Sequence, residues 1–308
     1  MKTKFNLFSI KYLVIILFFL MTSCHQETQK QAILWYKQPA KSWLEALPLG
    51  NGKLGVMVFG NTTNERIQLN DDSLWPAHLE EWSEPEGNKN DLQNIRKLLF
   101  EGKNDEADKL FVEKFSRKKV VRSHQTLGDL WLDFKLANIT DYKRELNINN
   151  AISTTSYKSN GQQITQKVFV SQPKKAIVIQ ITSEAKEGLN GKIRLTRPKD
   201  QGFATATTFT TADNSLVMQG EVTQRNGHFD SKPAPILKGV QFETRLKTNN
   251  VDGKILKGKD FLELKNVKKA TIYIVSNSSF YVDDFKNQNN IDLRQIEKHG
   301  FDDLEKEE

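Results

Sequence analysis

The stretch WLEALPLGNGKLGVMVFGNTTNERIQLNDDSLW, residues 43–75, decides the fold that we predict for the chain. Gly50, Gly52 and Gly55 have the spacing of a dinucleotide-binding loop, which requires a strand before it and a helix after it. The segment that follows, 54–59, is instead apolar and rich in β-branched residues, as in a strand. We therefore predict a glycine turn with a positive φ that leads into a buried strand.

A second predicted strand, 66–69, leads into the polar sequence Asn70-Asp71-Asp72-Ser73. Asp and Ser side chains commonly bond to backbone amides in turns. A turn would bring the two neighbouring carboxylates together, whereas a strand would point them to opposite faces. The local interpretation is a turn that its own side chains stabilise.

The N-terminus has the pattern of an export signal. Three lysines lie in the first eleven residues, before an apolar run, 12–21, that is too short for a stable membrane span. The only cysteine, Cys24, follows in a pattern that resembles a bacterial lipoprotein cleavage site. We expect a signal peptide at 1–23, lipid on Cys24, a flexible tether at 24–32 and a protein anchored to the cell envelope. An ordinary signal peptide with an incidental cysteine is the alternative.

The composition fits a folded chain that relies on packing. Its 308 residues are 37% hydrophobic, enough for one or two domains, and a single cysteine permits no disulfide within the chain. The net charge of +7 becomes about +4 without the three signal lysines (7 − 3), and no basic cluster is interleaved with aromatic residues. We expect no nucleic-acid partner. The five histidines show no ligand spacing, so we expect neither a metal nor another cofactor.

Two helices are predicted at 88–101 and 104–115, where apolar residues recur every three or four positions. Asn88 or Asn90 can cap the first helix, and Gly102 ends it. The two form a helical hairpin that we expect to pack on the flank of a sheet.

From residue 127 onward the apolar pattern alternates with a period of two. Asn160-Gly161 lies between two such runs and indicates a β-hairpin. Further short strands, spaced about ten residues apart, are predicted at 176–182, 192–196, 204–211, 215–223, 240–248, 261–264 and 270–275. The predicted fold is mainly β, a large antiparallel β-sandwich with the helical hairpin as an insertion.

The C-terminal residues predict a linker followed by a helix. Residues 287–290 have the composition of a linker, and 291–308 have a helical pattern that is interrupted near Gly300. This pattern reaches the last residue without a stop signal, which favours a truncated chain.

These segments together resemble the N-terminal domain of glycoside hydrolase family 95, the α-L-fucosidase and α-L-galactosidase family. The resemblance is carried by 43–60 with 65–75, by IRKLLFEGK at 95–103, by QTLGDLWLDF at 125–134 and by YKREL at 142–146. It extends from about Leu34 to the end of the chain. Lys53, Val56 and Asp71-Asp72-Ser73 depart conservatively from the residues that are commoner in the family.

The resemblance implies a β-sandwich domain at 33–286, a linker helix at 287–308 and then a six-hairpin α/α barrel. It also implies inverting hydrolysis of terminal α-linked fucose, with the catalytic groups on loops of the barrel. No position of this chain matches those catalytic motifs. We therefore expect no catalytic residue in the chain and no hydrolysis by the chain alone.

Six residues of the opening stretch are candidates for an interface with the barrel or for the rim of its pocket. They are Glu45, Asn51, Asn70, Asp71, Asp72 and Trp75. For Trp43 and Trp75, packing in the core or at an interface is the favoured interpretation, and stacking on a sugar is the alternative. Catalysis without the barrel would need two carboxyl groups about 6.5–9.5 Å apart, one of them with a raised pKa.

Three hypotheses of different classes remain. The chain is the inactive N-terminal part of an anchored fucosidase-like hydrolase, or a carbohydrate-binding or scaffold module, or half of a split enzyme. The expected partners are a glycan when the barrel is present, a membrane through the lipid on Cys24, and an α/α-barrel partner chain in the split case.

Overall fold

The computed structural model describes residues 32–76, 86–115, 123–224 and 236–307. The predicted signal peptide, Cys24 and the tether up to residue 31 lie outside the described residues. Contacts divide the chain into Met1–Ala32 and Ile33–Glu308, and the fold described below is that of the second unit.

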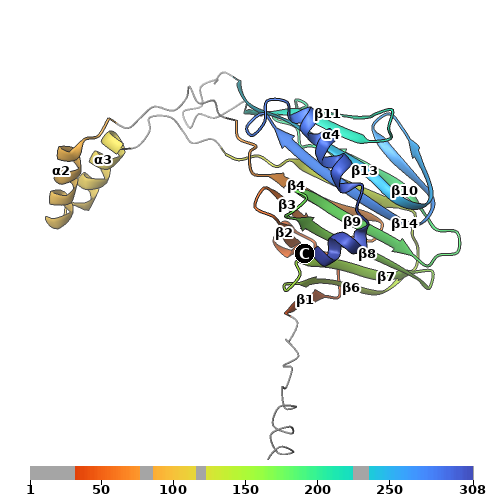
Figure 1. Cartoon of the computed structure of the whole chain (residues 1–308). Coiled ribbons are helices and arrows are strands. Elements are labelled where there is room, and N and C mark those ends of the chain that lie inside the picture. The colour runs from red at the N-terminus through yellow and green to blue at the C-terminus, as the bar shows by residue number, and fades with distance from the viewer. Residues whose placement is uncertain (1–31, 77–85, 116–122, 225–235, 308) are drawn as a thin grey trace, which may run out of the picture. The chain divides into compact units, whose positions relative to one another are not determined.

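The described strands form one hydrogen-bonded sheet in which every pair of neighbours is antiparallel (Figure 1). The main path runs β1 (Ile33–Tyr36), β6 (Ile139–Asn147), β7 (Ile152–Ser159), β8 (Gln162–Ser171), β9 (Ala176–Ser183), β14 (Phe261–Ser278), β10 (Leu189–Thr196), β5 (Gly128–Phe134), β4 (Asn64–Asp71), β3 (Leu54–Val58) and β2 (Leu47–Gly50). A branch continues from β14 to β13 (Leu237–Lys257), β12 (Leu216–Gln224) and β11 (Ala206–Thr210). The prediction of a mainly β, antiparallel fold with a helical hairpin is confirmed.

Strand β14 joins two layers of this sheet. Its first residues pair with β10, where Leu264 lies opposite Gly191. Its later residues pair with β9, where Ile272 lies opposite Ile179. The β10 side continues to β2 and the β9 side to β1, and the inner faces of both layers contribute to one hydrophobic core, for example Leu69, Leu132, Val168, Ile179, Ile193 and Ile274.

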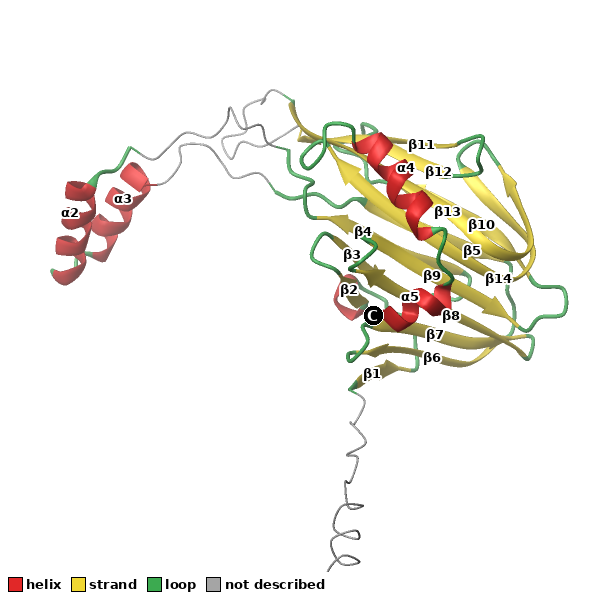
Figure 2. Cartoon of the chain, in the orientation of Figure 1, coloured by secondary structure: helices red, strands yellow, loops and turns green. Residues whose placement is uncertain are grey.

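Two C-terminal helices cover the outer face of β8, β9 and β14 (Figure 2). These are α4 (Phe285–Ile296) and α5 (Phe301–Glu307). A second core forms where Leu293 and Phe301 pack against Phe169, Val178 and Tyr273. Strand β9 is therefore buried on both faces, which explains its nearly unbroken apolar sequence AIVIQITS.

One expectation for the strands of the C-terminal half is wrong. Residues 240–248, 261–264 and 270–275 are not short separate strands, because they belong to the long strands β13 and β14. The segment around Asn249–Gly253, which has the composition of a turn, is a set of register shifts within the β13–β14 ladder.

The expected linker at 287–290 is also wrong, because these residues lie inside α4. Asp284 caps the helix by accepting a hydrogen bond from the Asn287 amide. Asn289 is fully buried and donates to the Glu243 carbonyl at 2.7 Å. The break near Gly300 is confirmed, since α4 ends at Ile296 and α5 begins at Phe301.

The predicted helical hairpin is present as α2 (Lys89–Phe100) and α3 (Asn104–Phe115). Asn88 caps α2 in a capping box with Asp91, and Gly102 ends the first helix with a φ of +75°. Within the hairpin the Gly87 amide donates to the Lys114 carbonyl at 2.7 Å, which ties its two ends together.

Candidate functional site

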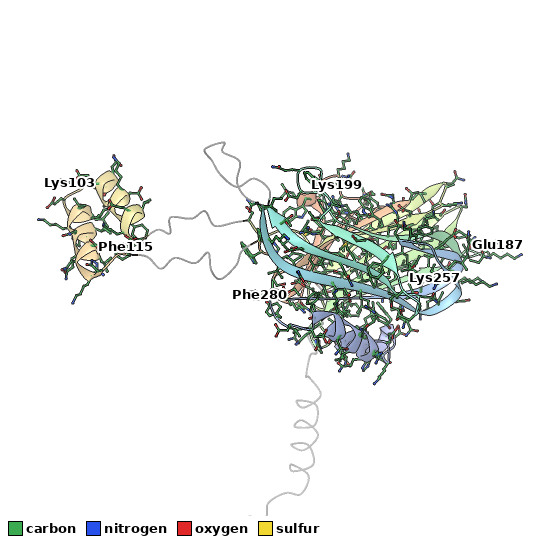
Figure 3. All side chains as sticks on the ribbon, turned by 90° about the horizontal axis from the view of Figure 1, so that it is seen from above. Lys103, Phe115, Glu187, Lys199, Lys257 and Phe280 are labelled. Atoms are coloured by element: carbon green, nitrogen blue, oxygen red, sulfur yellow. The ribbon has the colours of Figure 1, made fainter. Side chains whose placement is uncertain are left out.

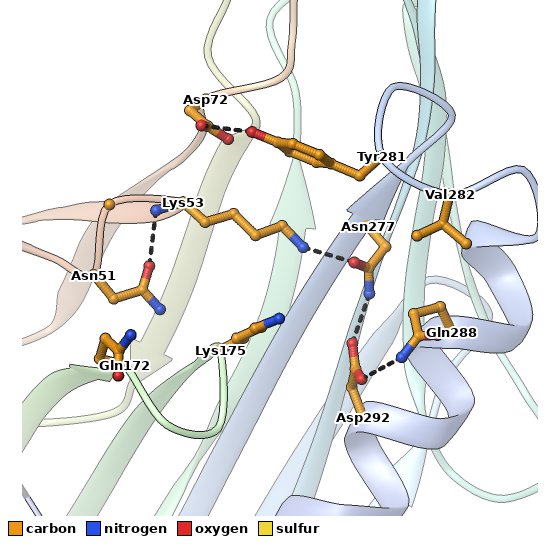
Figure 4. A pocket seen from close by; sticks show the side chains of 11 residues that line it. Asn51, Lys53, Asp72, Gln172, Lys175, Asn277, Tyr281, Val282, Gln288 and Asp292 are labelled. Atoms are coloured by element: carbon orange, nitrogen blue, oxygen red, sulfur yellow. Dashed lines mark hydrogen bonds between the residues drawn. The ribbon is translucent and has the colours of Figure 1, made fainter.

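A polar cavity of about 580 Å³ lies at one end of the strands, where β14 leads into the loop before α4. Figure 3 shows that Phe280, in this loop, lies at the opposite end of the sheet from Glu187 and Lys257. The lining comes from four distant parts of the chain: Asn51, Gly52, Lys53, Asp72, Gln172, Lys175, Asn277, Tyr281, Val282, Gln288 and Asp292. Figure 4 shows most of these side chains directed into the space between the β2–β3 turn and α4.

Lys53 crosses the cavity from the β2–β3 turn to the end of β14. Its Nζ donates to the Ser276 carbonyl at 2.8 Å and to Asn277 Oδ1 at 2.6 Å. Burial lowers the pKa of Lys53, while Asp71, Asp292 and Asp72 act in the opposite direction. Its ammonium therefore serves as a hydrogen-bond donor that connects the turn to β14.

The turn that carries Lys53 is shaped by Asn51. Its Oδ1 accepts from the Lys53 and Leu54 amides at 3.1 and 2.8 Å, and its Nδ2 donates to the Ser171 carbonyl at 2.8 Å. Gly52 adopts a φ of +91° between them, a conformation that favours glycine. The predicted glycine turn before a buried strand is confirmed.

The wall formed by α4 is held by a network of amides and one carboxylate. Asn277 Nδ2 donates to Asp292 Oδ2 at 2.8 Å and to Asn289 Oδ1 at 2.9 Å. Gln288 Nε2 donates to Asp292 Oδ1 at 2.7 Å. Both oxygens of Asp292 are therefore engaged, and the helix is fixed to the end of β14.

Asp71 and Asp72 end β4 as the local interpretation predicted. Asp71 is fully buried and its Oδ1 accepts from the Ser73 amide and hydroxyl at 3.1 and 2.6 Å. Asp72 Oδ2 accepts from the Tyr281 hydroxyl at 2.8 Å. Burial, followed by the hydrogen bond and charge of Asp72, raises the pKa of Tyr281 to about 12.

The β8–β9 turn contributes Gln172 and Lys175, which both have exposed side chains. In the part of the chain that the structure describes, neither side chain forms a hydrogen bond or ion pair. Lys175 lies close enough to Lys53 for its charge to lower the pKa of Lys53 further. The cavity thus contains two polar side chains without partners among the described residues, beside the hydrogen-bond network of Lys53, Asn277 and Asp292.

Four of the six candidate residues from the sequence lie at or beside this cavity. Asn51 and Asp72 line it, and Asp71 lies behind Asp72. Trp75 is 40% exposed, donates from Nε1 to the Asp72 carbonyl at 3.0 Å and packs edge-on against His124.

The other two candidates lie elsewhere. Glu45 is exposed and accepts from the Lys41 amide at 2.8 Å. Asn70 lines a separate, mostly apolar depression on the outer face of β2–β4, together with Trp43 and Met57. Trp43 is 54% exposed, so neither Trp43 nor Trp75 lies in the core, and their packing at an interface stays a prediction.

Sequence reasoning missed the lysines, Asn277, Tyr281 and Asp292 as site residues. Lys53 and Lys175 come from chain segments far from the other three residues, with Lys53 224 positions before Asn277, and only the pairing of β14 with β9 and the packing of α4 bring the group together. No local spacing connects them, so no motif could have identified the group.

The polar side chains of the cavity are mainly amides, ammonium groups and carboxylates. Among the described residues, no group of three or more His, Cys, Asp or Glu is placed to hold a metal ion. In the same residues, no helix has both the length and the apolar character needed to cross a bilayer.

The family is defined by a match to a domain model. The model of the glycosyl hydrolase family 65 N-terminal domain matches residues 34–282, and the chain belongs to this domain family. A solved structure described as "Putative kojibiose phosphorylase from human microbiome" has the same fold, with a TM-score of 0.50 and 12% identity over 84% of this chain and 34% of that one.

Three curated relatives are named as α-fucosidases. "Alpha-L-fucosidase 2" of Arabidopsis thaliana is 27% identical over 54% of this chain and 20% of its own length. "Probable alpha-fucosidase A" of Aspergillus niger is 30% identical over 46% of this chain and 18% of its own length. The same-named protein of Aspergillus oryzae is 32% identical over 49% of this chain and 22% of its own length. The chain spans about a fifth of the length of these relatives. The resemblance to the N-terminal domain of a glycoside hydrolase is thus confirmed.

Proposed function

We propose that the chain is the non-catalytic N-terminal β domain of an α-L-fucosidase-like glycoside hydrolase of the family 95 type. The observation that carries the proposal is the match of the domain model to residues 34–282 together with three α-fucosidase relatives. Inverting hydrolysis of terminal α-linked fucose is assigned to an α/α barrel, in the same polypeptide or in a partner chain.

The hydrogen bonds that the carboxylates of the cavity already form support a non-catalytic role. An inverting glycosidase needs one free carboxylic acid and one carboxylate that can reach a water. In the cavity Asp292 accepts hydrogen bonds on both oxygens, and Asp72 is bonded to Tyr281. Asp71 is buried against Ser73. These groups organise the cavity and leave no obvious acid–base pair among the described lining residues.

The proposed setting is the bacterial cell envelope. The lipoprotein-like sequence before Cys24 supports export and a lipid anchor, which would bring the domain to a membrane surface. The proposed partners are that membrane, a glycan and the barrel, and no nucleic acid. Replacing Cys24 with Ser should move the expressed protein from the membrane fraction to the soluble fraction, and an unchanged membrane association would contradict the anchor.

A fucosidase assay tests the catalytic part of the proposal. The purified chain should release no fucose from α-fucosylated oligosaccharides. The same chain, produced together with an α/α barrel encoded by the DNA that follows its own coding sequence, should release it with inversion at the anomeric carbon. Turnover by the purified chain that survives removal of contaminating enzymes would overturn the proposal.

A further inference from the structure

We propose that the cavity between the β2–β3 turn and α4 is a binding site for a neutral pyranose unit of a glycan. The proposal deepens the proposed function, and it rests on that function only for the choice of a glycan as the source of the pyranose. The volume of about 580 Å³ falls within the range of about 300–1,000 Å³ typical of small-molecule sites.

The charges of the lining favour a neutral ligand. Lys53 and Lys175 contribute two positive charges, and Asp72 and Asp292 contribute two negative charges. Buried Asp71 adds one further negative charge behind the wall, within electrostatic reach of Lys53. Because the four charges of the lining balance, an anion would meet the aspartates and a cation would meet the lysines, and the lining itself favours neither.

The free polar groups suit hydroxyls, which both donate and accept hydrogen bonds. Lys175 Nζ offers donors and the Gln172 amide offers both kinds of group, without partners in the described part of the chain. Asp72 uses Oδ2 for Tyr281, which leaves Oδ1 as an acceptor. Adjacent hydroxyls of a sugar ring can bridge a donor and an acceptor of this kind.

Tyr281 provides the apolar surface that a sugar also requires. Its ring lies beside the Lys53 side chain, whose Nζ is 5.7 Å from the ring centroid (Figure 4). The ring is held in place by the bond from its hydroxyl to Asp72, and its side chain is about half exposed, so ring surface remains for a ligand. The C–H face of a pyranose is apolar and can pack on such a ring.

Part of the site is held in place by hydrogen bonds within the protein, without any ligand. Lys53, Asn277 and Asp292 are linked in one chain of hydrogen bonds of 2.6 and 2.8 Å, which fixes the turn, the strand end and the helix relative to one another. Little ordering is then left for the ligand to impose, which favours binding of a small molecule.

The test is titration of the purified full-length chain with L-fucose, D-galactose and their methyl glycosides, followed by calorimetry and ligand-observed NMR. We expect saturable binding of at least one sugar with a dissociation constant of about 1 mM. Tyr281→Ala and Lys175→Met should each weaken that binding about tenfold. Tyr281→Phe should weaken it less, because the ring remains.

Lys174→Met is the matched control, since Lys174 lies in the same turn but pairs with Glu307 and does not line the cavity. It should bind sugar as the unchanged chain does. Because Tyr281 and Lys175 are exposed, their variants should remain folded, which circular dichroism will verify.

Three results would overturn the inference: no saturable sugar binding, equal binding by Tyr281→Ala and Lys174→Met, or Lys175-dependent binding of inorganic phosphate in place of sugars. These results are distinct from a failure of the proposed function. A chain that supports fucose release with its barrel but binds no sugar in the cavity refutes only the inference. A chain that binds sugar but never supports fucose release refutes only the function.

Discussion

Glu65 is a carboxylic acid enclosed in the core at the start of β4. Only 1% of its surface is exposed, and its two oxygens accept hydrogen bonds from the Gly60 and Asn61 amides of the β3–β4 turn. Burial raises the pKa of Glu65 from 4.5 to about 8, and the hydrogen bonds from the turn oppose this shift only in part. The folded protein therefore holds a proton that the unfolded chain releases at a lower pH.

The free energy of unfolding should consequently fall as pH rises from 4.5 to about 8 and then level off. Each unit of pKa difference corresponds to about 1.4 kcal/mol, so the effect should reach a few kcal/mol. Glu65→Gln removes the titrating group and should flatten this dependence. Urea unfolding at a series of pH values measures it, with the exposed Glu187→Gln as control. Equal slopes for the two variants would refute the assignment.

Arg144 is a second buried ionisable side chain, and it holds the N-terminal segment of the domain. It is 2% exposed and donates from Nε to the Gln38 carbonyl and from Nη1 to the Glu45 carbonyl, both at 2.8 Å. Its guanidinium also lies 4.3 Å from the ring centroid of Tyr36. One side chain of β6 thus fixes β1 and the turn that precedes β2.

Arg144→Met keeps the apolar stem but leaves two carbonyls without their donor. Since a hydrogen bond to a charged group contributes about 1.5–3 kcal/mol, we expect a loss of about 3 kcal/mol in the free energy of unfolding. Amide hydrogen exchange in residues 33–45 should also become faster. The exposed Arg294→Met is the control. A stability equal to that of the control would show that these bonds do not stabilise the fold.

At the scale of residues, the sequence predicted what depends on neighbours in the chain. The Asn51–Gly52 turn and the turn formed by Asp71 and Ser73 use side-chain bonds that span two or three residues. The role of Lys53 could not be predicted in this way, because its hydrogen-bond acceptors belong to Ser276 and Asn277. The residues near Lys53 in the sequence do not indicate these acceptors.

At the scale of elements, the same distinction separates α2 from α4. Helix α2 carries its own capping box, and the β7–β8 hairpin carries Asn160 and Gly161, both with positive φ, so each was predictable. Helix α4 buries three apolar residues and one polar residue, Asn289, which bonds to Glu243 and Asn277. The partners of this buried asparagine lie on distant strands. From the sequence alone, the polar segment around it therefore has the composition of a linker.

Helix α5 is short, and only two of its side chains, Phe301 and Leu304, are buried. Phe301 is 3% exposed and its ring centroid lies 5.3 Å from that of Phe169 on β8. Phe301→Ala should lower the free energy of unfolding by about 3 kcal/mol, as is usual when a buried phenylalanine is truncated. Asp302→Ala, one residue further along and exposed, should change it little. Equal urea midpoints for the two variants would mean that α5 does not contribute to the stability of the sheet.

At the scale of the whole molecule, we expect the sheet and its two C-terminal helices to unfold as one cooperative structure. The sheet has a core between its layers and a second apolar surface outside β8, β9 and β14. Stability depends on covering that second surface, since the chain has a single cysteine and no disulfide can form within it. The family match ends at residue 282, before α4, yet α4 and α5 provide four of the ten residues of the second core.

A chain that ends at residue 284 should therefore fail to form a stable monomer, although it retains every strand. Its truncation would expose Ile152, Phe169, Val178 and Tyr273, and would leave Asn277 without Asn289 and Asp292. An apolar patch of this kind promotes association, so we expect aggregation in size-exclusion chromatography and strong binding of a hydrophobic dye.

A chain that ends at residue 299 keeps α4 and loses only α5, and its urea midpoint should lie between those of the other two chains. If the chain that ends at residue 284 were monomeric and unfolded at the same urea concentration as the full chain, the two helices would not contribute to the stability of the sheet. Cooperative loss of structure would instead establish that the domain extends through α5.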